Sequence, residues 1–286
     1  MRFVYFVGTA GSGKSTLVKS YRDWLGNNGI DCMTINLDPG VDMLPYDADI
    51  DIREWVALDE VMGEYNLGPN GAQIVAADLM AVNIKKITDL LDGVRTEYVL
   101  VDTPGQLELF AFRESSNVIV EAFGKEKSMV VYLSDPMLCK TSNGFVSNMV
   151  LSSLVEFRLQ LPVINILTKA DLMKDEDRDR MISWFENSDS LYDDLLDNDA
   201  NPQTVVGMEL FKAVESVGIF GQIRAVSAVE NTGLEEIYSA TQLEFFGGED
   251  IDPEDNDWYQ HMMGFRESIS GPHRYVFIRT YMLEPV

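Results

Sequence analysis

A glycine-rich segment that ends in a lysine and a serine lies near the start of the chain. Residues 8–15 read Gly-Thr-Ala-Gly-Ser-Gly-Lys-Ser and fit the pattern G-x-x-x-x-G-K-[ST]. This spacing lets successive backbone N–H groups face one phosphate, while the lysine reaches the β/γ-phosphates and the serine hydroxyl reaches Mg²⁺. A glycine-rich turn without a ligand is the alternative. We expect a phosphate-binding loop made of Gly11, Ser12, Gly13, Lys14, Ser15 and Thr16.

Carboxylates follow two apolar segments farther along the chain. Asp38 comes directly after residues 31–37, and Asp102 ends a later apolar segment. An aspartate at the end of a strand commonly holds Mg²⁺, usually through a water, so we predict Ser15 and Asp102 as the metal-binding residues. The Asp-Thr-Pro-Gly sequence would also let the Gly105 N–H approach a γ-phosphate. Asp38 could orient water or hold Mg²⁺ through water, but within Asp-Pro-Gly it could equally cap a turn.

A Thr-Lys-Ala-Asp sequence at residues 168–171 is a variant of the Asn-Lys-x-Asp element, with Thr168 in place of the usual asparagine. The carboxylate of Asp171 can accept hydrogen bonds from both N1–H and N2–H of guanine, a pairing that adenine does not offer. The stem of Lys169 can pack on the face of the base. A helix cap without a base contact is the alternative. Two later residues follow another apolar segment and could offer a backbone N–H to guanine O6: Ser227 and Ala228.

These candidate residues follow apolar segments that alternate with helical patterns. Six apolar segments predict strands: 3–7, 31–37, 97–102, 128–135, 163–167 and 222–226. Other segments predict helices at 16–25, 52–65, 76–91, 144–160 and 234–246, and a tight turn at 67–72. The alternation indicates an α/β fold with a mostly parallel central sheet and helices on both faces, as in P-loop NTPases. Ligands bind at the carboxyl edge of such a sheet, where the candidate residues would meet.

The pattern also suggests a division of the chain. Residues 1–246 would form the nucleotide-binding domain, with a polar, acidic helical insertion at about 172–222. Within the insertion we expect helices around 177–187 and 204–217. Residues 247–286 begin as an acidic linker, which composition predicts to be solvated, and end in an aromatic-rich tail of unknown role.

Composition limits the function classes. The 286 residues carry 47 acidic and 22 basic side chains, which gives a net charge of −25. Such a surface repels phosphate backbones and anionic lipids, so we expect neither direct nucleic-acid binding nor membrane binding. A high-salt cytoplasm and a basic protein partner are both compatible with this charge. The two cysteines show no metal spacing, and together with a nucleotide-binding fold they favour a reducing, cytoplasmic location.

The motifs together resemble the GPN-loop GTPases, a branch of the P-loop proteins related to the signal-recognition and MinD-like class. The phosphate loop, Asp38, the Asp-Thr-Pro-Gly-Gln sequence, residues 168–171 and residues 227–228 occur in the order of a GTPase. Gly-Pro-Asn at residues 68–70 makes the resemblance specific. The likeness covers roughly residues 1–246, and the acidic chain is similar to the archaeal members.

The resemblance implies more than the spacing does. It implies Mg²⁺-dependent conversion of GTP to GDP in a homodimer, in which Asn70 contacts the γ-phosphate region of the partner subunit. It also implies that three residues position the attacking water: Asp38, Gln106 and Glu108. Eukaryotic members act in the assembly and nuclear import of RNA polymerase, so the resemblance implies a molecular switch or assembly factor with a protein partner.

Three other classes remain as alternatives. A MinD- or ArsA-like ATPase would carry a second lysine early in the phosphate loop, where this chain has Thr9. A nucleotide kinase would add a basic lid, but the insertion is acidic and its only arginines are Arg178 and Arg180. A nucleotide-gated binding protein with incidental hydrolysis would use the same residues as a GTPase, so the sequence does not choose between these two.

Overall fold

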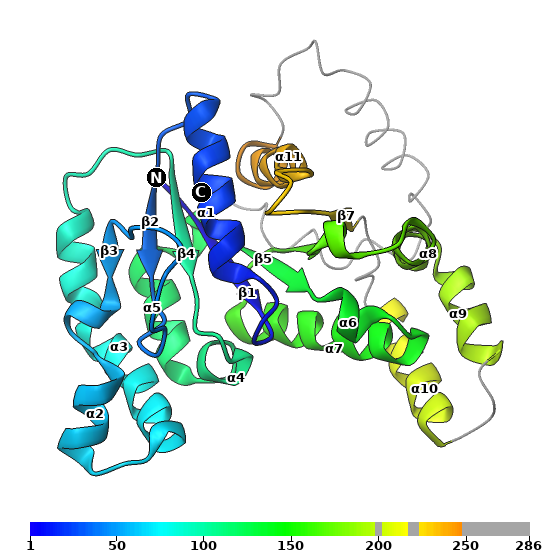
Figure 1. Cartoon of the computed structure of the whole chain (residues 1–286), viewed down its shortest axis with the longest axis horizontal. Helices are drawn as coiled ribbons and strands as arrows, with labels where there is room; N and C mark the ends of the chain where they lie inside the picture. The colour runs from blue at the N-terminus through cyan, green and yellow to red at the C-terminus, as the bar shows by residue number, and fades with distance from the viewer. Residues whose placement is uncertain (198–201, 217–222, 248–286) are drawn as a thin grey trace, which may run out of the picture.

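A sheet of seven parallel strands forms the middle layer of the computed structural model, which describes residues 1–197, 202–216 and 223–247 (Figure 1). The strands lie in the order β3-β2-β4-β1-β5-β6-β7. Their bounds are β1 Arg2–Gly8, β2 Cys32–Asn36, β3 Ile50–Asp51, β4 Tyr98–Asp102, β5 Ser128–Ser134, β6 Val163–Leu167 and β7 Arg224–Ala225. β1 lies at the centre, with Phe6 in register with Asp102 of β4 and with Val131 of β5. The expected α/β fold with a parallel sheet is therefore confirmed.

The six predicted strands are all present, and a seventh was missed. β3 contains only two residues, too few for a recognisable apolar alternation. β7 is shorter than the predicted segment 222–226, and Gln222 lies outside the described residues. The central strands β4 and β5 are buried along their whole length, which explains their continuous apolar sequences.

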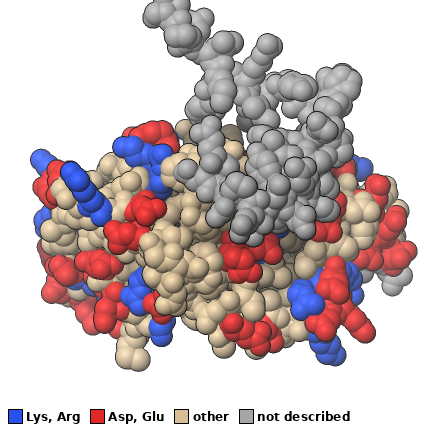
Figure 2. Space-filling view, turned by 90° about the horizontal axis from the view of Figure 1, so that it is seen from above, with Lys and Arg blue, Asp and Glu red and all other residues tan. Residues whose placement is uncertain are grey.

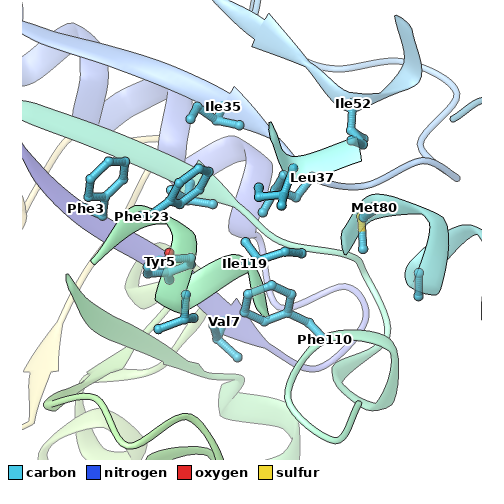
Figure 3. Packing of buried hydrophobic residues seen from close by; sticks show 14 of the residues in the cluster. Phe3, Tyr5, Val7, Ile35, Leu37, Ile52, Met80, Phe110, Ile119 and Phe123 are labelled. Atoms are coloured by element: carbon cyan, nitrogen blue, oxygen red, sulfur yellow. The ribbon is translucent and has the colours of Figure 1, made fainter. Parts of the chain in front are cut away.

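Helices cover both faces of the sheet because successive side chains of a strand point in opposite directions. Phe3, Tyr5 and Val7 of β1 enter a core that includes α3 (Pro69–Leu91), α5 (Glu114–Phe123) and α7 (Ser142–Leu159); Figure 3 shows part of this packing. Val4 and Phe6 belong to the core beneath α1 (Lys14–Asn27) and α11 (Leu234–Phe246). Four short helical segments complete this part of the chain: α4 Leu107–Phe110, η2 Lys125–Lys127, α6 Pro136–Cys139 and η3 Ala170–Leu172.

The segment around residues 52–76 differs from the expectation. The predicted helix at 52–65 is divided into η1 (Ile52–Glu54) and α2 (Leu58–Tyr65). The predicted tight turn at 67–72 is wrong: Gly68 is the N-cap of α3, and Pro69 is its first residue. Proline suits this position because its fixed φ angle matches a helix and its missing N–H would have no intrahelical partner. The Gly-Pro-Asn sequence thus starts a 23-residue helix.

A third core joins α7 to the helices that follow β6. These are α8 (Asp175–Glu186), α9 (Ser188–Asp197) and α10 (Pro202–Ser216), so the segment is helical as expected, with α9 as an addition. The division into domains stays a prediction, and the predicted linker and tail lie outside the described residues from 248 onward. No helix within the described residues is long and apolar enough to cross a membrane. Figure 2 shows Asp and Glu side chains spread over the visible surface, with Lys and Arg more sparsely placed.

Candidate functional site

The glycine-rich loop connects β1 to α1 with a sharp reversal of the backbone. A Cβ on Gly8 would lie 2.8 Å from the carbonyl oxygen of Leu133 in the neighbouring strand, so only glycine fits there. Gly11 and Gly13 have φ angles of 77° and 96°, which other residues rarely adopt. Gly13 is the N-cap of α1, and the helix therefore directs its N-terminal N–H groups toward the loop. This is the phosphate-binding geometry that the sequence predicts.

Lys14 is buried at the start of α1 and is held by backbone oxygens. Its Nζ donates to the carbonyl oxygens of Gly8 at 2.9 Å and Gly105 at 3.2 Å, and thereby joins the phosphate loop to the loop after β4. Burial lowers the pKa of Lys14, and the nearby carboxylates of Asp102 and Asp38 oppose this shift. An anion that replaces these carbonyl contacts would restore a favourable environment for the ammonium group.

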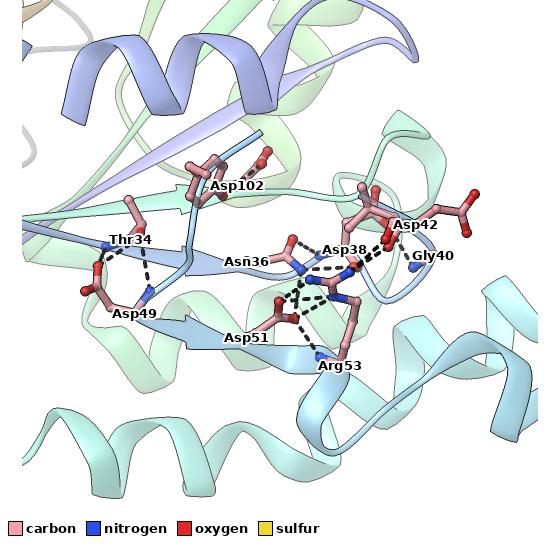
Figure 4. Close-up of polar contacts among 11 residues, drawn as sticks. Thr34, Asn36, Asp38, Gly40, Asp42, Asp49, Asp51, Arg53 and Asp102 are labelled. Carbon is pink, nitrogen blue, oxygen red and sulfur yellow. Dashed lines mark hydrogen bonds and ion pairs between the residues drawn. The ribbon is translucent and has the colours of Figure 1, made fainter. Parts of the chain in front are cut away.

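Asp38 connects the loop after β2 to the loop after β4. Its Oδ1 accepts a hydrogen bond from the Gly40 N–H, and its Oδ2 accepts one from the Gly105 N–H, each at 2.9 Å. Figure 4 shows Asp38 beside Gly40 at the end of the β2 loop. Asp38 therefore caps its own turn, which is one of the two predicted roles, and it also contacts the loop after β4; its predicted role toward water or Mg²⁺ stays a prediction. The Gly105 amide is bound by Asp38 while its carbonyl binds Lys14.

A network of polar and charged side chains, Asn36, Asp51 and Arg53, holds the Asp38 loop from the edge of the sheet and is called the brace below (Figure 4). The guanidinium of Arg53 binds both carboxylate oxygens of Asp51, with contacts of 2.6–3.0 Å, and also donates to the carbonyl oxygen of Val41 at 2.9 Å. Asn36 donates to Asp51 Oδ1 and accepts from the Asp38 N–H. Burial alone would raise the pKa of Asp51, but the hydrogen bonds from Arg53 and Asn36 outweigh it and lower that pKa.

Asp102 ends β4 beneath the phosphate loop and is 1% exposed. Its Oδ2 accepts a hydrogen bond from the Tyr46 hydroxyl at 3.0 Å, whereas its Oδ1 is buried and has no hydrogen-bond partner within residues 1–197, 202–216 and 223–247. Burial raises the pKa of Asp102 to about 6, while the hydroxyls of Ser15 and Tyr46 and the charge of Lys14 lower it. Of the predicted metal-binding pair, Ser15 thus lies in the first turn of α1 and Asp102 at the end of β4.

The other residues predicted near the phosphates differ in how exposed they are, and most of them lie at the surface. Gln106 is exposed and donates through Nε2 to Gln73 Oε1 of α3 at 3.0 Å. Glu108 is exposed in the first turn of α4, where its charge suits a helix N-terminus. Asn70 is exposed in the first turn of α3, one turn before Gln73. Ser12 is buried and Thr16 is exposed.

The loop after β6 lies over the phosphate loop. A Cβ on Gly13 would lie 4.0 Å from Cε of Lys169, whose own φ angle is 54°. Lys169 Nζ forms an ion pair of 2.7 Å with Asp135, the residue that follows β5. Thr168 is buried and donates from its hydroxyl to the carbonyl oxygen of Ser134. The threonine that replaces the usual asparagine therefore ties this loop to β5.

Asp171 and Ser227 meet although they are 56 residues apart in sequence. The Ser227 hydroxyl donates to Asp171 Oδ1 at 2.7 Å and so fixes the direction of the carboxylate. The Ser227 N–H donates to the carbonyl oxygen of Thr232. The carbonyl oxygen of Ala228 accepts from the hydroxyl of Ser20 in α1. The loops after β6 and β7 are thus held together beside the first helix.

Comparison with known proteins agrees with this arrangement. A protein-family model described as "Conserved hypothetical ATP binding protein" matches residues 6–245. A GPN-loop GTPase of Pyrococcus abyssi is 38% identical over 193 residues, which cover 66% of this chain and 75% of that protein. The chain belongs to the GPN-loop GTPase family. GPN-loop GTPase 1 of Dictyostelium discoideum is 32% identical over 84% of this chain, but the match spans only 60% of that longer protein.

The family fold extends over most of the chain. The crystal structure of a Pyrococcus abyssi GTPase in its apo form matches with a TM-score of 0.75 and 33% identity, over 86% of this chain and 98% of the other. The expected family membership is confirmed by these matches.

Several side chains that contact the predicted residues were not themselves predicted from the sequence, among them Asp135, Gln73 and Tyr46. Asp135 directly follows an apolar segment, so its place at a strand end was a usable signal. Gln73 could be recognised only once α3 was known to begin at Pro69. Tyr46 lies in a loop without periodicity, and its contact with Asp102 spans 56 residues. No sequence pattern indicates a pairing of that kind.

Proposed function

We propose that this chain is a GTPase that binds GTP with Mg²⁺ and converts it to GDP and phosphate. The observation that carries the proposal is the pair of bonds to Gly105, from Lys14 to its carbonyl and from its amide to Asp38. They bring the phosphate loop and the loops after β2 and β4 to one point at the carboxyl edge of the sheet. The names of the relatives, GPN-loop GTPases, point to the same reaction.

The choice of guanine over adenine rests on Asp171. The description of the matching family model names ATP, whereas the curated relatives are named GTPases. A carboxylate accepts hydrogen bonds only, and guanine presents two neighbouring donors where adenine presents a donor and an acceptor. The Ser227 hydroxyl supports this role because it orients Asp171. The Ser227 N–H already binds Thr232, so the contact to guanine O6 is assigned to Ala228.

Ser15 and Asp102 fit the proposed Mg²⁺ site. Mg²⁺ prefers oxygen ligands, keeps several waters, and is commonly held by one or two carboxylates together with substrate phosphates. The pair offers a hydroxyl and a carboxylate, and the buried Asp102 Oδ1 has no hydrogen-bond partner among the residues that the structure describes. When bound there, Mg²⁺ would neutralise charge on the β- and γ-phosphates.

Phosphate binding would rearrange the contacts around Gly105. The phosphates would take over Lys14 from the carbonyl oxygens of Gly8, Thr9 and Gly105, and the γ-phosphate would take over the Gly105 N–H from Asp38. Asp38 Oδ2 would then be available to orient the attacking water, with Gln106 beside it and Glu108 as the weaker candidate. Orientation of water and compensation of charge are what phosphoryl transfer needs from a protein.

The quaternary part of the proposal is a homodimer in which Asn70 completes the site of the partner subunit. The exposure of Asn70 and the position of Gln73 next to Gln106 support a role for the first turn of α3 near the γ-phosphate. The proposal also includes a cytoplasmic location and the role of a nucleotide-dependent switch or assembly factor with a protein partner. The family resemblance points to RNA polymerase assembly as the process in which it acts.

A nucleotide-binding and turnover assay tests the function. Calorimetry with GTP and ATP in Mg²⁺ should give at least about tenfold tighter binding of GTP, since a site built for two hydrogen bonds penalises the wrong base. Phosphate release from GTP should require Mg²⁺ and should stop in Lys14→Met. Equal affinity for ATP, or turnover that survives Lys14→Met, would contradict the proposal.

A further inference from the structure

Tyr46 is fixed from two sides in the loop between β2 and β3. It is 7% exposed and belongs to the buried cluster that also contains Phe6 and Leu17. The guanidinium of Arg22, on α1, lies 5.8 Å from the centre of the Tyr46 ring and donates to the carbonyl oxygen of Asp47 at 3.2 Å. The helix that begins in the phosphate loop therefore holds the tyrosine from its outer side.

The Tyr46 hydroxyl makes the two oxygens of Asp102 unequal. It donates to Oδ2 at 3.0 Å, and both groups are buried. Oδ1 has no hydrogen-bond partner in the described part of the chain. A buried carboxylate oxygen without a partner is costly, and such an atom calls for a ligand that the protein itself does not supply.

We propose that Tyr46 is a positioning residue for the Mg²⁺ site, because its hydroxyl holds Asp102 by Oδ2 and so presents Oδ1 to the metal and its water shell. The inference rests on the proposed function and adds a residue to it. Groups that hydrogen-bond to a metal-binding carboxylate commonly change metal affinity about 10- to 100-fold when removed. Tyr46 acts through Asp102, and it also links the metal site to the loop that carries Asp38.

The alternative role is purely structural: the hydroxyl would only satisfy a buried carboxylate. The two roles differ in what they affect. A structural role changes the stability of the protein and leaves the Mg²⁺ requirement of the folded protein unchanged. A positioning role raises the Mg²⁺ concentration that nucleotide retention needs, while nucleotide binding in EDTA stays as in the parent.

The test uses Tyr46→Phe, which keeps the ring and removes only the hydroxyl. The dissociation rate of a fluorescent GDP analogue is measured in buffers of increasing free Mg²⁺. We expect the half-maximal Mg²⁺ concentration to rise about tenfold or more. Tyr21→Phe is the matched control, because Tyr21 is fully buried in the same cluster and its hydroxyl has no hydrogen-bond partner among the described residues. Its Mg²⁺ requirement should equal that of the parent.

Two further variants test whether the effect of Tyr46 depends on the position of its ring and on Asp102. Arg22→Met keeps the hydroxyl but removes the cation beside the ring, and should raise the Mg²⁺ requirement about threefold. In an Asp102→Asn background, Tyr46→Phe should add no further shift, since both changes act on one interaction.

Three outcomes would overturn the inference. An unchanged Mg²⁺ requirement in both Tyr46→Phe and Arg22→Met would reject it, whatever happens to stability. Additive shifts in the double variant would show that Tyr46 does not act through Asp102. If nucleotide retention by the parent protein does not depend on Mg²⁺, the metal site of the proposed function is rejected, and this inference with it.

Discussion

At the scale of single residues, the proposed base site includes the carboxylate of Asp171, whose direction is set by another loop. The hydrogen bond from Ser227 to Asp171 Oδ1 orients the carboxylate, and Lys169 is held over the phosphate loop by Asp135. Base selectivity should therefore depend on the charge of Asp171 more than on the shape of the pocket. A substitution that keeps the shape and changes the hydrogen-bonding pattern tests this directly.

Asp171→Asn should weaken GTP binding about 10²-fold, because an amide offers one acceptor and one donor to the two donors of guanine. The same variant should gain affinity for xanthosine triphosphate, whose oxygen can accept from the new amide. Calorimetry with both nucleotides measures the shift. Asp175→Asn, at an exposed position on α8, is the control and should bind GTP like the parent. Unchanged GTP affinity in Asp171→Asn would reject the assignment.

Asp38→Ala should lower single-turnover hydrolysis of GTP about 10²-fold, the range seen when one positioning group is removed from an active site. GTP affinity should change little, because Asp38 touches the Gly105 loop and not the base. Asp42→Ala removes an exposed acid from the same loop and should hydrolyse GTP normally. A parental rate in Asp38→Ala would remove Asp38 from the catalytic scheme.

The sequence predicted the positions of some site residues in the fold, but it did not predict the contacts of all of them. Motif spacing put Lys14, Asp38 and Gly105 at one edge of the sheet, and the structure joins them by hydrogen bonds. The sequence could not show that both oxygens of Asp38 bind backbone amides. It could not show the contact of Tyr46 with Asp102 either, since that contact depends on how an irregular loop packs.

At the scale of elements, the two-residue strand β3 matters because it anchors the brace around Arg53. Asp51 closes β3, and Arg53 connects it to the carbonyl oxygens of the Asp38 loop. The side chains of Arg53 and Asp51 are 32% and 17% exposed, so water screens the pair only in part. The brace should therefore contribute both to stability and to the position of Asp38.

Arg53→Met should lower the free energy of unfolding by about 1 kcal/mol at pH 7, as expected for a partly exposed pair with two parallel hydrogen bonds. The pKa of Asp51 is lowered in the folded protein, so this stabilisation is present above the ordinary Asp pKa of about 4. It should vanish as the pH falls through the lowered value. Urea unfolding at pH 7 and at pH 3 and below measures the difference.

The matched control for Arg53→Met is Arg113→Met. Arg113 binds both oxygens of Asp78 with contacts of 2.6 and 3.0 Å, far from the Asp38 loop in sequence. Arg53→Met should also slow GTP hydrolysis several-fold, whereas Arg113→Met should not. A stability difference for Arg53→Met that persists unchanged at low pH, or equal hydrolysis by both variants, would contradict the role of the brace.

The elements were predictable where a strong apolar pattern existed. β4 and β5 are buried throughout and β1 is buried from Phe3 onward, and their apolar sequences reflect this. The start of α3 was misplaced because Gly-Pro-Asn also fits a turn; only the packing of Ala72, Ala76 and Met80 into the core shows that the helix begins earlier. β3 is too short to leave a pattern, and its pairing with β2 is decided by the fold around it.

At the scale of the whole molecule, a single chain leaves the role of Asn70 open. Asn70 is exposed, and within the described residues its side chain has no hydrogen-bond partner. The next turn of α3 carries Gln73, which binds Gln106 of the same chain. Two functions of Asn70 are therefore to be distinguished, one within its own site and one in the site of a second copy. They make opposite predictions for mixed dimers.

Asn70→Ala should lower GTP turnover and leave guanine recognition intact, because Asn70 lies on the phosphate side of the site. If it acts across a two-fold interface, each site uses Asp38 from one subunit and Asn70 from the other. A heterodimer of Asn70→Ala and Asp38→Ala subunits then has one site with both groups intact. Its activity should reach about half that of the parent, since one of two sites is restored.

Co-expression with two different affinity tags yields these heterodimers without relying on subunit exchange. Tandem purification isolates the mixed species, and the two homodimeric variants purified in the same way are the controls. If Asn70 works in its own site, the heterodimer combines one site that lacks Asn70 with one that lacks Asp38, and its activity should not exceed the mean of the two controls. That result, or a parent protein that is monomeric with GTP bound, would reject the proposed action of Asn70 in the partner's site.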